Sequence, residues 1–377
     1  MKKYFIICSL SLLLSLYLFE GYLKFFSSDF DLNRKVKIYE KNSSNKYDKR
    51  TKVQIYKDLK KIFDDVSVTV PPKTYVMHPE KDIFPLSGLA NSKTIHCNEN
   101  GYYSIFQSDR YGFNNPDTEW DAEEIEYLLI GDSYALGACV NRPNDIASIL
   151  RKLSKKNVLT LGYDGNGPLK EYAVLREYLK INVKNVIWIY TESNDLDNLN
   201  DELGSKILVN YSKDKLFSQK LITKQKIIDN YGLIKIDEEE ELYNKKIIKN
   251  FLKLYHTRGV LNMTLPDKLQ PKNKIYEYKL NTDFKKVLSL AKNLVLKNNS
   301  NFYFVYIPNF KTPKSEHLYK KTKNMMKILD IEVIDIFKEV HQKEENISKL
   351  FPLNISGHYN EYGYQKIAKT INSKISK

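Results

Sequence analysis

The stretch Tyr127-Leu128-Leu129-Ile130-Gly131-Asp132-Ser133-Tyr134 is a short apolar run that ends in glycine and polar residues. Such a run is typical of a strand that is buried on both faces of a parallel sheet. Runs of the same kind follow at Asn157–Gly162, Val186–Tyr190, Phe302–Ile307 and Glu332–Ile336. Together these segments predict a parallel five-stranded sheet.

Segments of helical composition lie between the predicted strands. They are placed at about Asp145–Leu153, Leu169–Lys180, Phe284–Leu296, His317–Leu329 and Tyr362–Ser373. The alternation of strands and helices predicts an α/β fold with helices on both faces of the sheet, a three-layer sandwich. Residues 197–280 are too many for one connection, and their charged helical segments indicate an inserted helical subdomain or lid.

The N-terminus carries a targeting signal. Lys2 and Lys3 precede an apolar run from Tyr4 to Phe19, which Glu20 interrupts. No small residues suited to signal cleavage follow the run, so residues 1–26 are expected to remain as a signal anchor. The paired lysines should stay cytoplasmic, which places the chain after residue 30 on the extracytoplasmic side, periplasmic or at the cell surface.

The remaining chain divides by composition. Residues 27–67 are polar and lysine-rich and are expected to form a tether. Residues 68–124 contain several prolines and short aromatic runs, which predict an irregular or β-rich lead-in. Residues 125–377 then form the α/β domain, with the insertion at about 197–280.

The net charge of +14 allows an anionic partner. The lysines, however, are spread along every segment rather than gathered in one stripe. A solvated lysine surface explains this distribution, so no nucleic-acid partner is expected.

The chain has three cysteines. Cys8 lies in the anchor, whereas Cys97 and Cys139 lie in the exported part, where they can form a disulfide or remain buried thiols. No cluster of cysteine and histidine has the spacing of metal ligands, so neither a metal nor another cofactor is expected.

Ser133 lies at the carboxyl end of the first predicted strand, where open α/β sheets bind ligands. Gly131 allows a tight turn there, and the following helix can direct free N–H groups at an anionic intermediate. A serine nucleophile needs a base. His358, which precedes the last predicted helix, has a suitable setting, and the five other histidines do not.

Two further loops offer donors for an oxyanion hole, which must stabilise charge on a carbonyl oxygen. Gly165 follows the second predicted strand, where its N–H can face a ligand without a side chain in the way. Asn194 follows the third predicted strand, and its amide can donate as well. Asp195 is expected to cap the segment after it.

These elements resemble, in order and spacing, the four sequence blocks of the SGNH (GDSL-like) hydrolases: Gly131-Asp132-Ser133, Gly165, Asn194-Asp195 and His358-Tyr359-Asn360. The resemblance covers about residues 125–375. It implies a flavodoxin-like three-layer fold with Ser133 as nucleophile and His358 as base. It also implies an oxyanion hole formed by the N–H groups of Ser133 and Gly165 and by the side chain of Asn194.

The chain departs from the family pattern before the histidine. The family usually has an aspartate two or three residues upstream, where this chain has Ser356 and Ile355. We therefore expect a Ser-His dyad in which Ser356, a backbone carbonyl or a distant carboxylate such as Asp335 orients the imidazole. Ser193 also replaces the glycine that usually precedes the asparagine.

The lead-in looks like that of exported bacterial SGNH proteins often linked to surface polysaccharides. The resemblance lies in Cys97-Asn98-Glu99-Asn100-Gly101 and in Ser108-Asp109-Arg110-Tyr111-Gly112-Phe113-Asn114-Asn115-Pro116. The leading hypothesis is an esterase that removes acyl groups, most simply acetyl, from an extracytoplasmic glycan through an acyl-serine. The alternatives are a glycan O-acetyltransferase that uses the same site, a non-catalytic glycan-binding or assembly protein with a decayed triad, and a lipid-directed esterase. The sequence makes no prediction of oligomeric state.

Overall fold

The computed structural model describes residues 2–26, 30–70, 73–76, 83–180, 182–260 and 274–376. Its strands are β1 (Val66–Val68), β2 (Lys93–Ile95), β3 (Ile105–Gln107), β4 (Ile125–Gly131), β5 (Val158–Thr160), β6 (Val183–Thr191), β7 (Asn301–Ile307) and β8 (Glu332–Asp335). Its α-helices are α1 (Lys2–Phe26), α2 (Phe30–Asn42), α3 (Lys52–Lys60), α4 (Lys73–Val76), α5 (Ser133–Leu136), α6 (Ile146–Ser154), α7 (Pro168–Tyr178), α8 (Asp195–Glu202), α9 (Lys206–Lys213), α10 (Gln225–Leu252), α11 (Tyr255–Val260), α12 (Lys274–Lys297), α13 (Glu316–Ile328), α14 (Ile336–Glu339) and α15 (Glu361–Ile375).

The central sheet has the strand order β5-β4-β6-β7-β8, and every neighbouring pair is parallel. The predicted parallel five-stranded sheet is therefore confirmed. In chain order the strands run 2-1-3-4-5, which is the flavodoxin-like order. The order reverses beside β4, so the loops after β4 and β6 diverge at the point where such sheets bind ligands.

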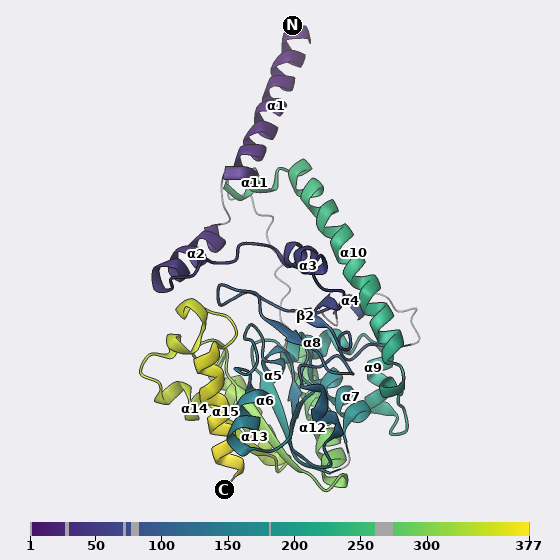
Figure 1. Cartoon of the computed structure of the whole chain (residues 1–377). Coiled ribbons are helices and arrows are strands. Elements are labelled where there is room, and N and C mark those ends of the chain that lie inside the picture. The colour runs from purple at the N-terminus through teal and green to yellow at the C-terminus, as the bar shows by residue number, and fades with distance from the viewer. Residues whose placement is uncertain are drawn as a thin grey trace.

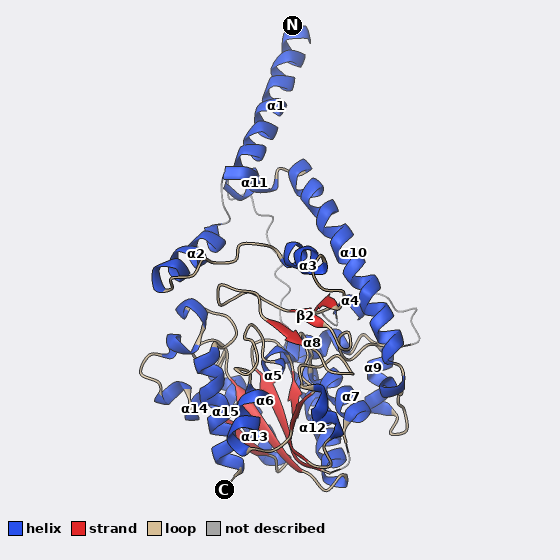
Figure 2. Ribbon diagram, in the orientation of Figure 1, coloured by secondary structure: helices blue, strands red, loops and turns tan. Residues whose placement is uncertain are grey.

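Alternate residues of each strand enter two separate cores, because successive side chains of a strand point to opposite faces. Leu128 and Trp188 pack on the face covered by α7, α12 and α13. Leu129 and Ile187 pack on the opposite face, which α6 and α15 cover. Figure 2 shows the red sheet between these two groups of helices. The predicted three-layer sandwich is thus present.

A second, smaller sheet lies above the carboxyl end of the main sheet and consists of β1, β2 and β3. β1 pairs parallel with β2, and β2 pairs antiparallel with β3. The three strands come from the region predicted as the end of the tether and the lead-in. This sheet carries the segment from His96 to Asn100 towards the loops that follow the main strands.

The predicted insertion divides into two parts. α8 and α9 pack on α7 and belong to the main body. α10 leaves that body, and α11 at its far end lies against α1 (Figure 1). No described residue of this segment lines the cavity beside Ser133. Residues 261–273 of the predicted insertion lie outside the described residues.

α1 is the one helix of the described chain that is long and apolar enough to cross a membrane. The span comprises Lys2–Lys24, with a mean hydropathy of 1.8. It projects away from the body in Figure 1. Length and composition alone identify this span, and a signal sequence would have the same properties.

Candidate active site

The β4–α5 junction positions Ser133. Gly131 has φ +155°, and a Cβ at this position would lie 2.7 Å from the carbonyl oxygen of Ile189 and 2.9 Å from the Cβ of Ala135. Only glycine fits this turn without strain. Asp132 then caps α5 by accepting a hydrogen bond from the N–H of Tyr134 at 2.9 Å. Ser133 is therefore held at the first position of the short helix that follows the central strand.

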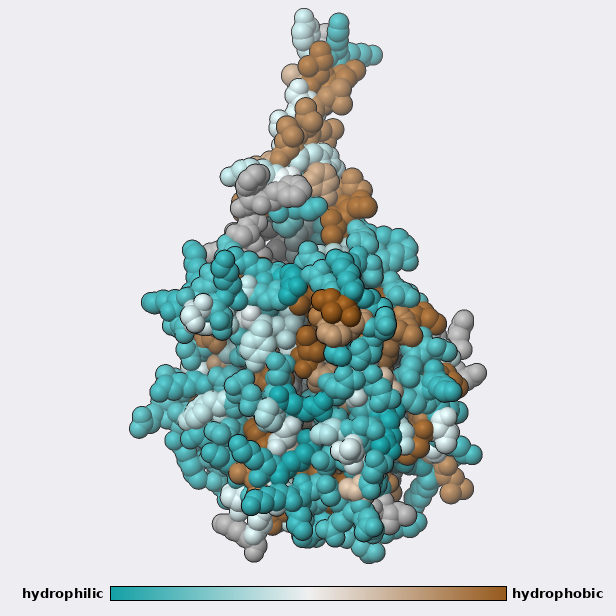
Figure 3. All heavy atoms as spheres, in the orientation of Figure 1, coloured by the Kyte–Doolittle hydropathy of each residue, from teal (hydrophilic) through white to brown (hydrophobic). Residues whose placement is uncertain are grey.

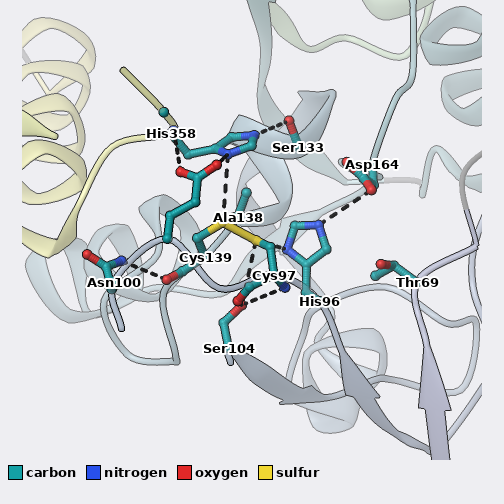
Figure 4. The surroundings of a disulfide bond; sticks show 12 residues. Thr69, His96, Cys97, Asn100, Ser104, Ser133, Ala138, Cys139, Asp164 and His358 are labelled. Carbon is teal, nitrogen blue, oxygen red and sulfur yellow. Dashed lines mark hydrogen bonds and ion pairs between the residues drawn. A yellow bond between two sulfur atoms is a disulfide. The ribbon is translucent and has the colours of Figure 1, made fainter. Parts of the chain in front are cut away.

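His358 approaches from the loop before α15. Asn360 fixes this loop, because its Oδ1 caps α15 at the N–H of Gly363 while its Nδ2 donates to the carbonyl oxygen of Lys349. Nε2 of His358 lies 2.9 Å from Oγ of Ser133, as Figure 4 shows. This distance is that of a serine hydrogen-bonded to its base.

The other side of the imidazole contacts Glu99, a residue of the lead-in. Oε1 of Glu99 lies 3.1 Å from Nδ1 of His358, and Oε2 accepts the backbone N–H of the same histidine at 2.7 Å. A carboxylate at Nδ1 places the proton there and leaves Nε2 free to accept the proton of the serine. Ser133, His358 and Glu99 thus form a hydrogen-bonded series.

Glu99 corrects the expectation that Ser356 or Asp335 orients the imidazole. Asp335 instead accepts hydrogen bonds from the hydroxyl of Tyr319 and from Lys323, and it caps α14. Ser356 lines the cavity beside His358, but no hydrogen bond joins the two side chains in the described structure. The positions two and three residues before His358 hold Ser356 and Ile355, and the carboxylate that contacts the imidazole belongs to a different segment of the chain.

A disulfide holds Glu99 in place. Cys97 and Cys139 are bonded to each other, with their Cα atoms 5.0 Å apart. Nδ2 of Asn100 also donates to the carbonyl oxygen of Cys139 at 2.8 Å. The residues on both sides of Glu99 are therefore tied to the loop that follows Ser133. Figure 4 shows the disulfide next to His358, whose Nδ1 lies 3.7 Å from the sulfur of Cys139.

Glu99 is not among the site residues predicted from the sequence, although the sequence contains a signal for it. Cys139 comes six residues after Ser133, and Glu99 comes two residues after Cys97. A bridge between the two cysteines brings Glu99 close to the nucleophile, but the sequence alone did not decide whether this disulfide forms.

The electrostatics of the pair favour a charged histidine. Burial acts to lower the pKa of His358, but the hydrogen bond to Glu99 and the charge of that carboxylate outweigh it, so the pKa is raised above its ordinary value. Burial acts to raise the pKa of Glu99, but the contact with His358 outweighs it and the pKa is lowered. Glu99 is therefore a carboxylate that stabilises the imidazolium.

Of the predicted oxyanion donors, Asn194 lines the cavity at Ser133 and Gly165 does not. Asn194 lies beside Ser133 in the cavity, and its Nδ2 donates one hydrogen bond to Oδ2 of Asp132 at 3.1 Å. An amide NH₂ carries two N–H groups, so the second one remains available to donate to a ligand. Gly165 has φ +68° in the loop after β5, and it is not among the residues that line the cavity.

The cavity at Ser133 has a volume of about 230 Å³. Its lining is mainly polar and comprises Glu99, Ser133, Tyr134, Ser193, Asn194, Asn309, Phe310, Ser356, Gly357 and His358. Pockets for drug-sized ligands usually have volumes of about 300–1,000 Å³. The space is therefore suited to a small acyl group.

Two groups of residues near this site have the composition of metal ligands. One consists of His96, Cys97 and Cys139, and the other of Glu99, Cys139 and His358. Each includes sulfur of the disulfide, which is not a thiolate and does not ligate as one. Their proximity is explained by the disulfide and the Glu99–His358 pair.

No protein-family model matches the chain, and no curated protein matches it. The chain is similar to solved structures of SGNH and GDSL hydrolases. These include an acetyl xylan esterase (11% identity, TM-score 0.36, 67% of this chain and 100% of that one). A member of the lipolytic G-D-S-L family from Veillonella parvula has 12% identity and a TM-score of 0.36, covering 67% of this chain and 99% of that one. A lipase/acylhydrolase from Enterococcus faecalis has 11% identity and a TM-score of 0.37, covering 67% and 95%.

Proposed function

We propose that this chain is a serine ester hydrolase that removes small acyl groups, most simply acetyl, from an extracytoplasmic glycan. The observation that carries this proposal is the hydrogen-bonded series Ser133–His358–Glu99, with distances of 2.9 Å and 3.1 Å. A decayed site would not be expected to retain both contacts, and the geometry therefore favours a working enzyme over a non-catalytic binding protein.

The acylation step begins when Oγ of Ser133 attacks the carbonyl carbon of the ester and passes its proton to Nε2 of His358. Glu99 stabilises the resulting imidazolium. The negative charge on the carbonyl oxygen is stabilised by the side chain of Asn194 and the N–H of Ser133, which both line the cavity. Collapse of the intermediate breaks the ester bond, and His358 gives its Nε2 proton to the departing sugar oxygen, which leaves as a hydroxyl.

The deacylation step repeats this chemistry with water. His358 takes a proton from the water, whose oxygen attacks the acyl-serine, and the released serine regains a proton from the imidazolium. The carboxylic acid then leaves. An O-acetyltransferase would use a sugar hydroxyl in place of water at this step, with the same residues.

Membrane attachment is part of the proposal. The apolar helix α1 is long enough to cross a bilayer, and Lys2 and Lys3 at its start favour an orientation with the enzyme outside the cytoplasm. The disulfide between Cys97 and Cys139 supports the same side, because such bonds persist in oxidising compartments.

The test is hydrolysis of p-nitrophenyl acetate by the full chain in detergent. Ser133→Ala and His358→Ala should each abolish the activity, whereas His317→Ala, which changes an exposed histidine, should not. Esters of longer acids should react more slowly because the cavity is small.

A second experiment offers acetylated glycan to the enzyme with and without an acceptor sugar. Acetyl transfer to the acceptor without release of acetate would identify the enzyme as an O-acetyltransferase. If Ser133→Ala keeps both the esterase activity and the acetyl-transfer activity, the proposal is refuted.

A further inference from the structure

Residues 225–260, here called the arm, connect the enzyme body to the apolar helix. α10 has 28 residues, which corresponds to a length of about 42 Å. Figure 1 shows it rising from the body to the lower end of α1, where α11 packs against that helix. The arm thus reaches the same level as the proposed membrane span.

Charge is strongly segregated along the arm. Residues 225–241, nearer the body, contain six acidic residues and two lysines. Residues 242–260, here called the arm tip, contain five basic residues and no acidic one. A surface helix that only bridged two parts of a protein in water would not need this division. A basic end matches the anionic headgroups of a bilayer.

Large apolar side chains are exposed at the same end. The arm tip presents Leu242, Ile248, Leu252, Tyr255 and Val260, each of which is more than half exposed. Ile248 and Leu252 are four residues apart and so lie on one face of α10. Figure 3 shows brown side chains continuing from α1 onto the surface next to it. Apolar, aromatic and basic residues together are the composition of an interfacial membrane helix.

The arm tip makes specific polar contacts with the span. Glu20 of α1 is fully buried and accepts hydrogen bonds from the backbone N–H groups of His256 and Thr257, at 3.0 Å and 2.8 Å. The hydroxyl of Thr257 donates to the same carboxylate at 2.8 Å. An acidic residue near a bilayer needs partners of this kind. The contact therefore explains why the apolar run tolerates Glu20.

The contacts also give the depth of the arm tip. The hydroxyl of Tyr17 donates to the carbonyl oxygen of Leu252, and the ring of Tyr17 lies 5.6 Å from that of Phe251. Tyr17 precedes Lys24, the end of the span, by seven residues, or about 10 Å along the helix. Interfacial helices bury their apolar face to about 5–10 Å. The arm tip lies at this depth if α1 crosses the bilayer.

We infer that the arm tip is a second membrane-binding element, which inserts Ile248, Leu252 and Tyr255 into the outer interface of the bilayer beside α1. This inference rests on the membrane span in the proposed function but not on the esterase activity. Two attachments, α1 and the arm, hold the enzyme body at a fixed distance from the lipid surface.

The test uses tryptophan fluorescence of the full chain in vesicles of phosphatidylcholine and phosphatidylglycerol, with and without lipids brominated on their acyl chains. Leu252→Trp and Ile248→Trp each place a probe in the arm tip. Leu14→Trp places one inside the span, and Leu216→Trp places one on an exposed loop of the body. The native Trp120 and Trp188 are 8% and 0% exposed and give the background, which is measured in the unchanged protein.

Brominated lipid should quench the probes at Leu252 and Ile248 about as strongly as the probe at Leu14, and it should leave the probe at Leu216 unquenched. Quenching at Leu14 but at neither arm position would overturn the inference while leaving the span intact. If the chain then forms dimers in detergent, a second copy covers the arm tip instead. Absence of quenching at Leu14 would overturn both the span and the arm, whatever the esterase activity.

Discussion

Glu99 contacts His358 with both carboxylate oxygens across 259 positions of the chain, one oxygen at the imidazole and the other at the backbone N–H. The double contact fixes the ring and its tautomer at once. In the resembled family the carboxylate usually precedes the histidine by two or three residues. Here the carboxylate lies in the connection between β2 and β3 of the small sheet, so the lead-in segment completes the candidate site.

The role of Glu99 can be tested with Glu99→Gln. The charge of Glu99 helps to raise the pKa of His358 above its ordinary value, and the histidine must be neutral to act as a base. Activity is therefore expected to fall on the acid side as pH drops through that raised pKa. Glu99→Gln should lower kcat/KM by about 10²- to 10⁴-fold and move this acid limb to lower pH. Steady-state kinetics across pH measure both effects.

Asp335→Asn is the matched control for Glu99→Gln, because Asp335 contacts Tyr319 and Lys323 rather than the imidazole. Its acid limb should coincide with that of the unchanged enzyme. If Asp335→Asn moves the limb and Glu99→Gln does not, the assignment of Glu99 is wrong.

Removal of the disulfide should affect both stability and the site. Cys97 and Cys139 are separated by 42 positions, and a bridge closing such a loop contributes about 4 kcal/mol in the chain-entropy description. The double change Cys97→Ser/Cys139→Ser should lower the free energy of unfolding by about this amount. It should also loosen Glu99, so that the acid limb moves in the same direction as in Glu99→Gln.

Cys8→Ser is the control for that experiment, since Cys8 is a free cysteine of α1. Urea unfolding gives the stability, and kinetics at temperatures where both proteins remain folded give the pH profile. A loss of stability with an unchanged pH profile would show that the disulfide supports the fold without positioning Glu99.

The fold was predictable because its signals are local. Each of the five central strands is a short apolar run, and the predicted ranges differ from the observed ones by a few residues at the ends. Ser133 and His358 were predicted from their places after a strand and before a helix, together with their order in the chain. Glu99 was not found because its place depends on a contact between distant segments, and no local pattern marks it.

The arm was missed for a related reason. Helical composition in residues 197–280 predicts helices, but it does not tell where they point. α8 and α9 are apolar on one face and pack on the body, whereas α10 is mainly acidic nearer the body and is basic with exposed apolar side chains at its far end. The change of charge at about residue 241 was the available signal that this helix leaves the body.

Asn194→Ala tests the oxyanion hole. The side chain of Asn194 lies in the cavity next to Ser133, and it should donate to the oxyanion more strongly than to the uncharged ester. The change should therefore lower kcat by about 10²- to 10³-fold with little effect on KM. Asn309→Ala, in the wall of the same cavity, should act mainly on KM. If Asn194→Ala raises KM and leaves kcat unchanged, Asn194 binds substrate in the ground state instead.

Glu171 offers a test of stability that is independent of activity. The side chain is fully buried, and neither carboxylate oxygen has a hydrogen-bond partner in the described structure. Burial, together with the charges of Asp195 and Asp132, raises the pKa of Glu171 well above its ordinary value. The folded protein therefore holds a proton that the unfolded chain releases above about pH 4.3, and stability should fall as pH rises from there towards the raised pKa.

Glu171→Gln removes this titration while keeping the shape of the side chain. At about pH 4 the two proteins should have similar free energies of unfolding, because Glu171 is then largely protonated in both states. At about pH 8 the variant should be more stable, by about 1.4 kcal/mol for each pH unit over which only the folded protein holds the proton. Glu124→Gln, at an exposed glutamate, should show no such difference. Urea unfolding at the two pH values measures the effect, and a Glu171→Gln protein that loses stability at about pH 8 would mean that the charged carboxylate has a stabilising partner in solution.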